Sequence, residues 1–119
     1  MSRVDLRRKV DLAWLAAFYG GLLTENQRRV LTLHCEEDLS LGEIADEVGI
    51  SRQAVHETLN RAAEKLAAME ASLGVAERFR RMEDGLSKAL DSLNAERYDE
   101  ARQTLEALLA LDTEDENGL

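Results

Sequence analysis

The fold of this 119-residue chain is decided by the stretch Leu39-Ser-Leu-Gly-Glu-Ile-Ala-Asp-Glu-Val-Gly-Ile-Ser-Arg-Gln-Ala-Val-His-Glu-Thr-Leu59. Ser40 and Glu43 have the spacing of a capping box, which predicts the start of a short helix. Gly49 stops that helix, and Ser51 caps the helix that follows it. The stretch therefore predicts a helix, a tight turn and a second helix.

The apolar residues of this stretch are spaced so that the two helices pack against each other. Ala45 is small where the helices must approach closely, and Gly49 permits the turn that redirects the chain. The expected contacts between the helices come from Ile44, Ala45, Val48, Ile50, Val55 and Leu59. This is the helix-turn-helix arrangement, in which the second helix can enter a DNA major groove. An ordinary helical hairpin is the alternative.

The rest of the chain predicts helix as well, because it contains no Pro and is rich in Ala, Leu, Glu and Arg. In the first helix, one apolar face is expected from Val10, Ala13, Trp14, Ala17 and Phe18, with a second stripe of Leu12, Leu15 and Tyr19 beside it. The expected helices cover about residues 4–19, 25–37, a short segment after Ser40, 51–73, 75–93 and a last helix capped by Asn94. The fold class is all-α, with a C-terminal helical extension.

The glycine at position 74 interrupts the helical pattern and suggests a division of the chain into three parts. We expect a helix-turn-helix domain over residues 1–73, a helical hairpin over 74–111 and an acidic disordered tail over 112–119.

The formal charge of −9 argues against binding nucleic acid with the whole surface. Any such role must come from a local patch. Residues 51–65 contain three basic and two acidic side chains, a net charge of only +1. The second helix of the motif therefore has a weak electrostatic basis for DNA affinity.

The candidate DNA-contacting side chains are those that point away from the apolar positions of that second helix. Arginine suits guanine or phosphate, while glutamine and asparagine pair with adenine. The candidates are Ser51, Arg52, Gln53, His56, Asn60 and Arg61. Arg52 and Arg61 in surface ion pairs would be the alternative.

Other chemistry is not indicated by the sequence. The single Cys35 fits a reducing compartment, and it cannot form a metal set with only two histidines in the chain. We find no catalytic motif and expect no cofactor, no bound metal and no enzymatic activity. Without a signal peptide or a long apolar run, we expect a cytoplasmic protein that does not contact the membrane.

Four stretches carry a family resemblance: Phe18-Tyr-Gly-Gly-Leu-Leu-Thr-Glu-Asn-Gln27, Ser40-Leu-Gly-Glu-Ile-Ala45, Ile50-Ser-Arg-Gln-Ala-Val55 and Glu77-Arg-Phe-Arg-Arg81. They resemble the YlxM family of small bacterial proteins. A less close resemblance, to region 4 of bacterial sigma factors, is carried by Gln27-Arg-Arg-Val-Leu31, by the stretch from Ser40 to Ser51 and by Val55 with Arg61-Ala62. The resemblance covers about residues 6–83. It implies a sigma-70 region 4-like DNA-binding motif and a regulatory part in the signal recognition particle pathway.

Two hypotheses for the binding partner follow. The first is a regulatory protein that binds DNA. The second is an adaptor that keeps the fold and binds the signal recognition particle GTPase or its RNA. We also expect a homodimer, formed by the first helix and the apolar seam over residues 59–93, since two-fold proteins often bind two DNA half-sites.

Overall fold

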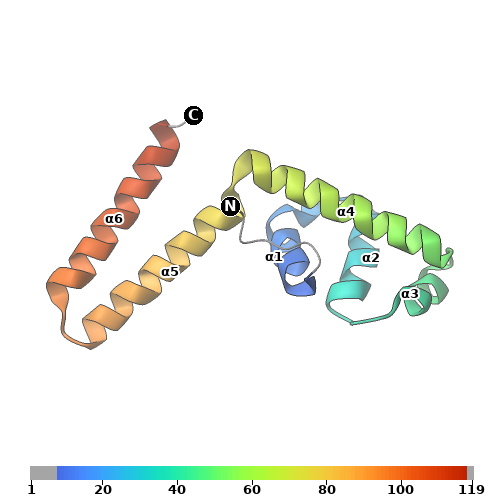
Figure 1. The fold of residues 1–119 in the computed structure, drawn as a ribbon, viewed down its shortest axis with the longest axis horizontal. Helices are drawn as coiled ribbons and strands as arrows, with labels where there is room; N and C mark the ends of the chain where they lie inside the picture. Colours follow the sequence, from blue (N-terminus) through green and yellow to red (C-terminus); the bar gives the residue numbers. More distant parts are fainter. Residues whose placement is uncertain (1–7, 118–119) are drawn as a thin grey trace. The chain divides into compact units, whose positions relative to one another are not determined.

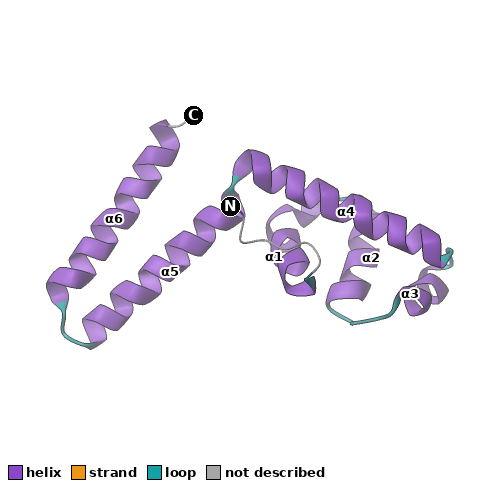
Figure 2. Ribbon diagram, in the orientation of Figure 1, coloured by secondary structure: helices purple, strands orange, loops and turns teal. Residues whose placement is uncertain are grey.

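The fold is described from a computed structural model, whose backbone is described for residues 8–117 and whose side chains are described up to residue 111. Within that range the structure is helical, and no strand is present (Figures 1 and 2). The helices are α1 (Lys9–Tyr19), the 3₁₀ helix η1 (Gly20–Leu22), α2 (Glu25–Cys35), α3 (Leu41–Val48), α4 (Arg52–Leu73), α5 (Val75–Asn94) and α6 (Tyr98–Asn117).

The chain divides into two compact units, Met1–Ala76 and Glu77–Leu119. The domain boundaries predicted at residues 73 and 111 stay predictions, as does the disordered tail predicted over 112–119. The backbone of α6 is helical as far as Asn117. None of the described helices is both long and apolar enough to cross a membrane.

The first unit is built around α4, against which α1, α2 and α3 all pack (Figure 1). Its core is formed by apolar side chains from every one of these helices, with Leu15, Val30, Ile44, Val55 and Leu66 fully buried. Three helices therefore support the one helix whose first turns were predicted to contact DNA.

Helix α1 buries a different face from the one expected. Leu12, Leu15 and Tyr19 are buried, whereas Val10 is 59% exposed. Trp14 and Phe18 are half-buried at the edge of the core, in an edge-to-face pair with ring centroids 5.5 Å apart. The helix is apolar over a wide arc, and the stripe that contains its leucines packs into the core instead of the stripe that contains Ala13 and Ala17. The predicted start, residues 4–7, lies outside the described residues.

The predicted starts of α2, α3 and α4 are confirmed. Thr24 and Gln27 form a complete capping box at the start of α2. Ser40 and Glu43 form another at α3, and Ser51 Oγ accepts a hydrogen bond from the Ala54 N–H at 3.0 Å.

A hydrogen-bond network joins the end of α4 to α1. The hydroxyl of the buried Tyr19 donates to Glu70 Oε1 at 2.5 Å and accepts from the Val75 N–H at 3.1 Å. The same Glu70 oxygen accepts from the Ala76 N–H at 3.0 Å. Two of the amides at the start of α5, which have no partner inside their own helix, are satisfied in this way.

The second unit is the hairpin of α5 and α6. Asn94 is the last residue of α5, so the prediction that it caps α6 is wrong. The turn is instead made by Glu96, which has a φ of 60°. Its N–H donates to Leu93 O, and the Arg97 N–H donates to Ser92 O at 2.8 Å. This is the Schellman pattern of a helix end, which glycine usually provides.

The two hairpin helices approach closely at Gly85. A Cβ at that position would lie 2.5 Å from Leu108 Cδ2. The contact between the helices is otherwise made by small side chains, since Ala89, Ser92 and Ala101 are buried beside Leu108.

The predicted dimer seam over residues 59–93 divides between two roles. Leu59, Ala62 and Leu66 are buried inside the first unit and cannot contact a second chain. Leu86 and Leu93 are 49% and 44% exposed. Leu73 at the end of α4 is 54% exposed, so the part of the seam that is open to a partner consists of this residue and the exposed residues of α5.

Candidate nucleic-acid interface

The turn between α3 and α4 is set by Gly49, which has φ 81° and ψ 33°. Its N–H donates to Ala45 O at 2.8 Å, and the Ile50 N–H donates to the same carbonyl at 3.2 Å. Residues with a Cβ rarely adopt this left-handed conformation. The chain therefore reverses in three residues, from Gly49 to Ser51, as a helix-turn-helix requires.

The core fixes the orientation of α4 about its own axis. Ile44 and Ala45 of α3 are buried, as are Val55 and Leu59 of α4. The buried residues of α4 face α3 and the rest of the unit, so the residues between them must face outward. The contact between the two helices agrees with the sequence prediction.

All six predicted DNA-contacting residues are exposed. Arg52, His56 and Asn60 follow one another at intervals of four, so they lie along one face of α4. Gln53 lies beside them in the first turn. The structure therefore brings these four side chains onto one outward surface.

Two of the six have a different position or role. Ser51 has a structural role as well, because its hydroxyl oxygen accepts a hydrogen bond from the Ala54 N–H. Arg61 is one residue past Asn60 and therefore points about 100° away around the helix. It lies outside the surface that the other four residues form.

Arg52 packs over the first turn of α3. A Cβ at Gly42 would lie 3.5 Å from Arg52 Nε and 3.7 Å from Cζ. The guanidinium therefore rests on a position of α3 that carries no side chain, which holds it beside the first turn of that helix. Sequence reasoning missed this role of Gly42, although a glycine in the first turn of a helix was the available signal.

His56 and Asn60 are neighbours on the outer face of α4. Asn60 Nδ2 lies 3.2 Å from His56 Nε2, and the amide donates when the ring proton is on Nδ1. The pair presents the Asn60 carbonyl oxygen outward as an acceptor. An asparagine pairs with adenine through one N–H and its carbonyl oxygen, and since the amide nitrogen carries two hydrogens, one N–H of Asn60 stays available for such a contact beside the hydrogen bond to His56.

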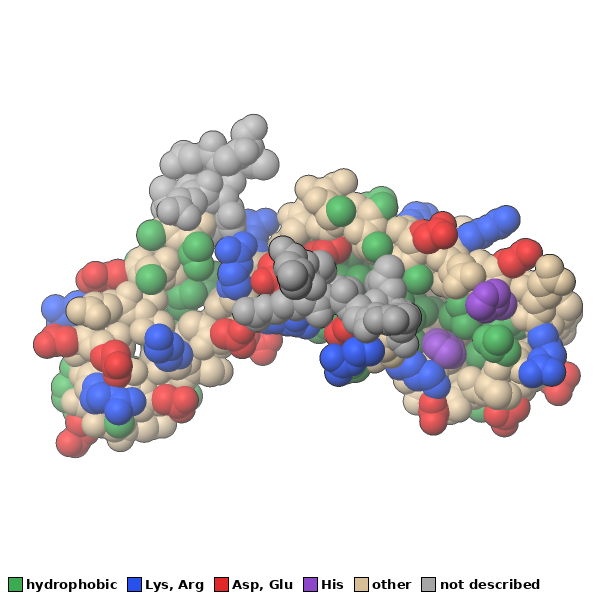
Figure 3. Space-filling model, viewed as in Figure 1, with side chains coloured by type: hydrophobic (Ala, Val, Ile, Leu, Met, Phe, Trp, Pro, Cys, Tyr) green, Lys and Arg blue, Asp and Glu red, His purple; other side chains and the backbone are tan. Residues whose placement is uncertain are grey.

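The electrostatics of the surface are mixed. Glu57 and Glu64 are exposed on the same helix as Arg52 and Arg61. On the face that Figure 3 shows, basic and acidic side chains alternate and form no continuous basic patch. Binding of a phosphate backbone here would depend on a few positioned side chains.

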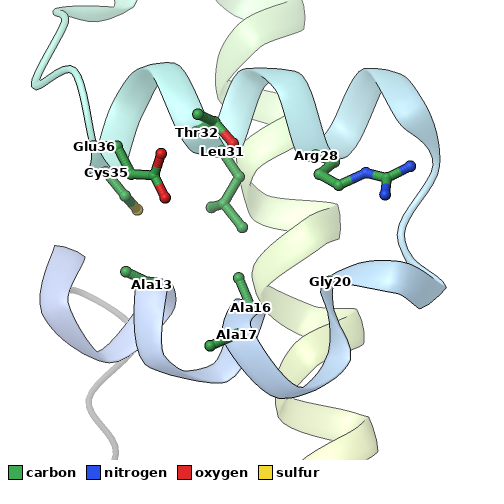
Figure 4. Close-up of a pocket in the computed structure, with 9 residues that line it drawn as sticks. All are labelled: Ala13, Ala16, Ala17, Gly20, Arg28, Leu31, Thr32, Cys35 and Glu36. Atoms are coloured by element: carbon green, nitrogen blue, oxygen red, sulfur yellow. The ribbon is translucent and has the colours of Figure 1, made fainter.

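A shallow groove of about 250 Å³ lies between α1 and α2 (Figure 4). Ala13, Ala16 and Ala17 form its α1 wall, with Arg28 toward one end and Glu36 toward the other. Cys35 also lines it, and burial raises the pKa of this thiol. A thiol kept protonated is a poor nucleophile, so the groove shows no sign of chemistry.

His34, near the end of α2, has a perturbed pKa. Burial lowers the pKa of His34, and the nearby Lys9 ammonium lowers it further, although Asp38 opposes them. Lys9, at the start of α1, forms an ion pair with Asp38, which follows the end of α2. Within the described residues, no group of three His, Cys, Asp or Glu side chains is placed to hold a metal ion.

Residues 6–107 match the profile of a family described as "UPF0122: Putative helix-turn-helix protein, YlxM / p13 like". The chain belongs to this family. A UPF0122 protein of Symbiobacterium thermophilum is 46% identical over 83% of this chain and 92% of its own length. One from Desulforamulus reducens is 42% identical over 82% of each chain. One from Bacillus mycoides is 35% identical over 90% of this chain and 99% of its own.

Membership of UPF0122 confirms the family resemblance noted in the sequence. It also agrees with the all-α fold, because the family is of the helix-turn-helix kind. The match extends to residue 107 and so takes in α5 and part of α6 as well as the motif. The family match therefore covers most of the sequence that forms the hairpin.

Proposed function

We propose that this protein is a regulatory DNA-binding protein, without enzymatic activity, that places the first turns of α4 in the major groove. The observation that carries the proposal is the outward surface of Arg52, Gln53, His56 and Asn60 on a helix held by a buried core. Arginine, glutamine and asparagine can each make bidentate contacts to base edges.

The proposed contacts differ in role. Gln53 and Asn60 are suited to adenine, while Arg52 is suited to guanine or to a phosphate beside the first turn of α3. Arg61, about 100° away from Asn60, is suited only to the phosphate backbone at the edge of the groove. The protein would act in the cytoplasm, where its DNA lies.

The test is DNA binding by electrophoretic mobility shift and fluorescence anisotropy with fragmented bacterial genomic DNA, at two salt concentrations. We expect Arg52→Ala and Gln53→Ala to weaken binding to a selected fragment by about 10-fold or more, since a good base contact is worth roughly 1–3 kcal/mol. Lys88→Ala makes the same charge change as Arg52→Ala at an exposed position of α5 and should leave binding unchanged. Equal affinity of all variants would refute the proposal.

The charge distribution favours a second candidate function. Residues 1–73 carry a net charge of −3 and residues 74–119 a net charge of −6, which gives α4 little help in attracting a polyanion. We propose as the alternative an adaptor of the signal recognition particle that binds its GTPase or its RNA. Capture from a bacterial lysate with and without nuclease separates the two functions. Recovery of that GTPase after nuclease treatment would support the adaptor.

We also propose that the protein is a homodimer. The support is the large number of apolar side chains that α5 and α6 leave exposed. Sedimentation at micromolar concentration tests this, and a mass of one chain would refute it.

A further inference from the structure

The hairpin of α5 and α6 has too small a core to be stable by itself. Up to residue 111, where its side chains are described, the buried ones are Ala89, Ser92, Ala101 and Leu108, of which only Leu108 is large. Two helices that meet through small side chains bury little apolar surface, and units this small need additional packing. The second unit therefore requires a partner surface.

The hairpin leaves a set of large apolar side chains exposed near its turn. On α5 these are Leu86, Leu90 and Leu93, which are 49%, 57% and 44% exposed. On α6 they are Tyr98 and Leu105, which are 61% and 39% exposed. We call these five residues the hairpin face.

The two helices present these residues to the same side. On α5, Leu86 and Leu93 each follow by one residue a position that faces α6, Gly85 and Ser92, and so are turned about 100° from the contact. On α6, Leu105 follows the contact residue Ala101 by four positions and is turned in the same rotational sense. Because the helices run antiparallel, equal senses of rotation bring both sets to one side of the hairpin.

We propose that the hairpin face packs against the hairpin face of a second copy of this chain, so that the two hairpins form a four-helix bundle. The five side chains leave an apolar area on the order of 500 Å² exposed per chain. The aliphatic parts of neighbouring polar side chains add to it, which brings the area close to the roughly 800 Å² per partner of a standard interface. A two-fold axis allows one such surface to complete itself. This proposal rests on the proposed homodimer and names its surface.

The pattern on α5 is the one that self-pairing helices use. Phe79, Met82, Leu86, Ala89 and Leu93 are separated by three or four residues in alternation, which is the spacing of a seam between helices. Ala89 serves the contact inside the hairpin, and the leucines on either side of it serve the second copy. The apolar seam of α5 thus contacts both α6 and the second copy of the chain.

The charges around the hairpin face give the interface a distinct salt dependence. Residues 83–106 contain seven acidic and three basic side chains, a net charge of −4. The negative charges around the hairpin faces of two chains repel each other, and salt screens this repulsion. The dimer should therefore become tighter as salt is added, whereas DNA binding becomes weaker.

The test is sedimentation equilibrium of the full chain, with Leu86→Glu and Leu93→Glu as separate variants. Both residues are about half exposed in a single chain, so the variants should keep the helical circular dichroism of the wild type. We expect the wild type to have the mass of two chains and each variant to raise the dimer dissociation constant at least 10-fold. Leu22→Glu is the matched control, because Leu22 is 53% exposed in the first unit, and it should stay dimeric.

The outcomes separate the two proposals. A wild type with the mass of one chain at 100-fold the working concentration, about 100 µM, would overturn both the homodimer and this surface. A wild-type dimer that persists with unchanged affinity in Leu86→Glu and Leu93→Glu would leave the homodimer standing and overturn the hairpin face as its interface. A dimer weakened equally by Leu22→Glu would also overturn it.

Discussion

Tyr19→Phe removes a single oxygen atom and with it two hydrogen bonds, one from α1 to the end of α4 and one from the start of α5 to α1. The hydroxyl is buried, donates to the Glu70 carboxylate at 2.5 Å and accepts from the Val75 N–H at 3.1 Å. A hydrogen bond to a charged group contributes about 1.5–3 kcal/mol, and the amide left without its partner adds to the loss. Val75 is 36% exposed, so water can recover part of that second cost. We expect a loss of about 2–3 kcal/mol.

The assay is urea unfolding followed by the fluorescence of Trp14, the single tryptophan, which lies in the same unit as the network. A domain of this size has a total stability of about 5–15 kcal/mol, so the expected loss shifts the midpoint clearly. Tyr98→Phe is the matched control, because that hydroxyl is on a side chain 61% exposed. It should change the stability by less than about 0.5 kcal/mol.

A double-mutant cycle makes the prediction specific to the network. Glu70→Gln keeps an oxygen for Tyr19 and the Ala76 N–H but loses the charge, so it should cost less than Glu70→Ala. Tyr19→Phe together with Glu70→Ala should cost at least about 1 kcal/mol less than the sum of the single changes. Additive losses, or a loss from Tyr19→Phe no larger than that from Tyr98→Phe, would refute the reasoning.

Three further changes test other features of the fold. Gly85→Ala puts a methyl group 2.5 Å from Leu108 Cδ2, so thermal unfolding should show a loss of about 1–3 kcal/mol, and Leu108→Ala should cost less in that background than alone. Gly21→Ala, with nothing within 4 Å of the new carbon, is the control. Glu96→Gly replaces a residue at φ 60° and should raise the stability by about 0.5–1 kcal/mol in the same assay; Glu96→Ala should give no such gain. The pKa of His34 in the folded chain is below its usual 6.5, so protonation of this histidine favours the unfolded chain. The contribution of neutral His34 to the folding stability is therefore complete above pH 6.5. It is lost as the pH falls from there through the pKa of the folded chain. Urea unfolding between pH 7.5 and 5.5 should therefore depend less on pH in His34→Gln than in the wild type.

Each of these expectations has a result that contradicts it. An unchanged melting temperature in Gly85→Ala would mean that the two helices do not approach at that position. A gain from Glu96→Ala equal to that from Glu96→Gly would assign the effect to the side chain rather than to the backbone. A slope of stability against pH that is the same in His34→Gln as in the wild type would exclude this histidine as its source.

The sequence predicted well those features that depend on neighbouring residues. The capping box at Ser40 and the cap at Ser51 involve groups three residues apart, so their patterns determine the local structure. The helix-turn-helix followed from the same kind of signal, because Gly49 and the buried positions beside it lie within one short stretch. The family profile agrees with that prediction.

Features that depend on distant parts of the chain were not predictable in this way. The partner of Tyr19 lies 51 residues away at Glu70, and no spacing rule connects them. The buried face of α1 was misassigned because that helix is apolar over a wide arc, and only its neighbours select the face.

The end of α5 shows a third kind of failure. Asn94 looked like a cap because asparagine favours helix ends, but the chain stays helical through it and turns at Glu96, where a residue with a Cβ occupies a left-handed position. Local preference was outweighed there by the packing of Ala89 and Ala101 across the hairpin.

The network at Tyr19 also determines where this chain can be shortened. A chain that stops at Leu73, where the helical pattern breaks, would keep the tyrosine and the glutamate but lose both amides that they receive from residues 75 and 76. A chain that continues through Ala76 would retain all three hydrogen bonds and the buried methyl group of Ala76 itself. The first turn of α5 thus belongs to the folding of the helix-turn-helix unit, and a deletion or fusion that respects it should leave that unit intact.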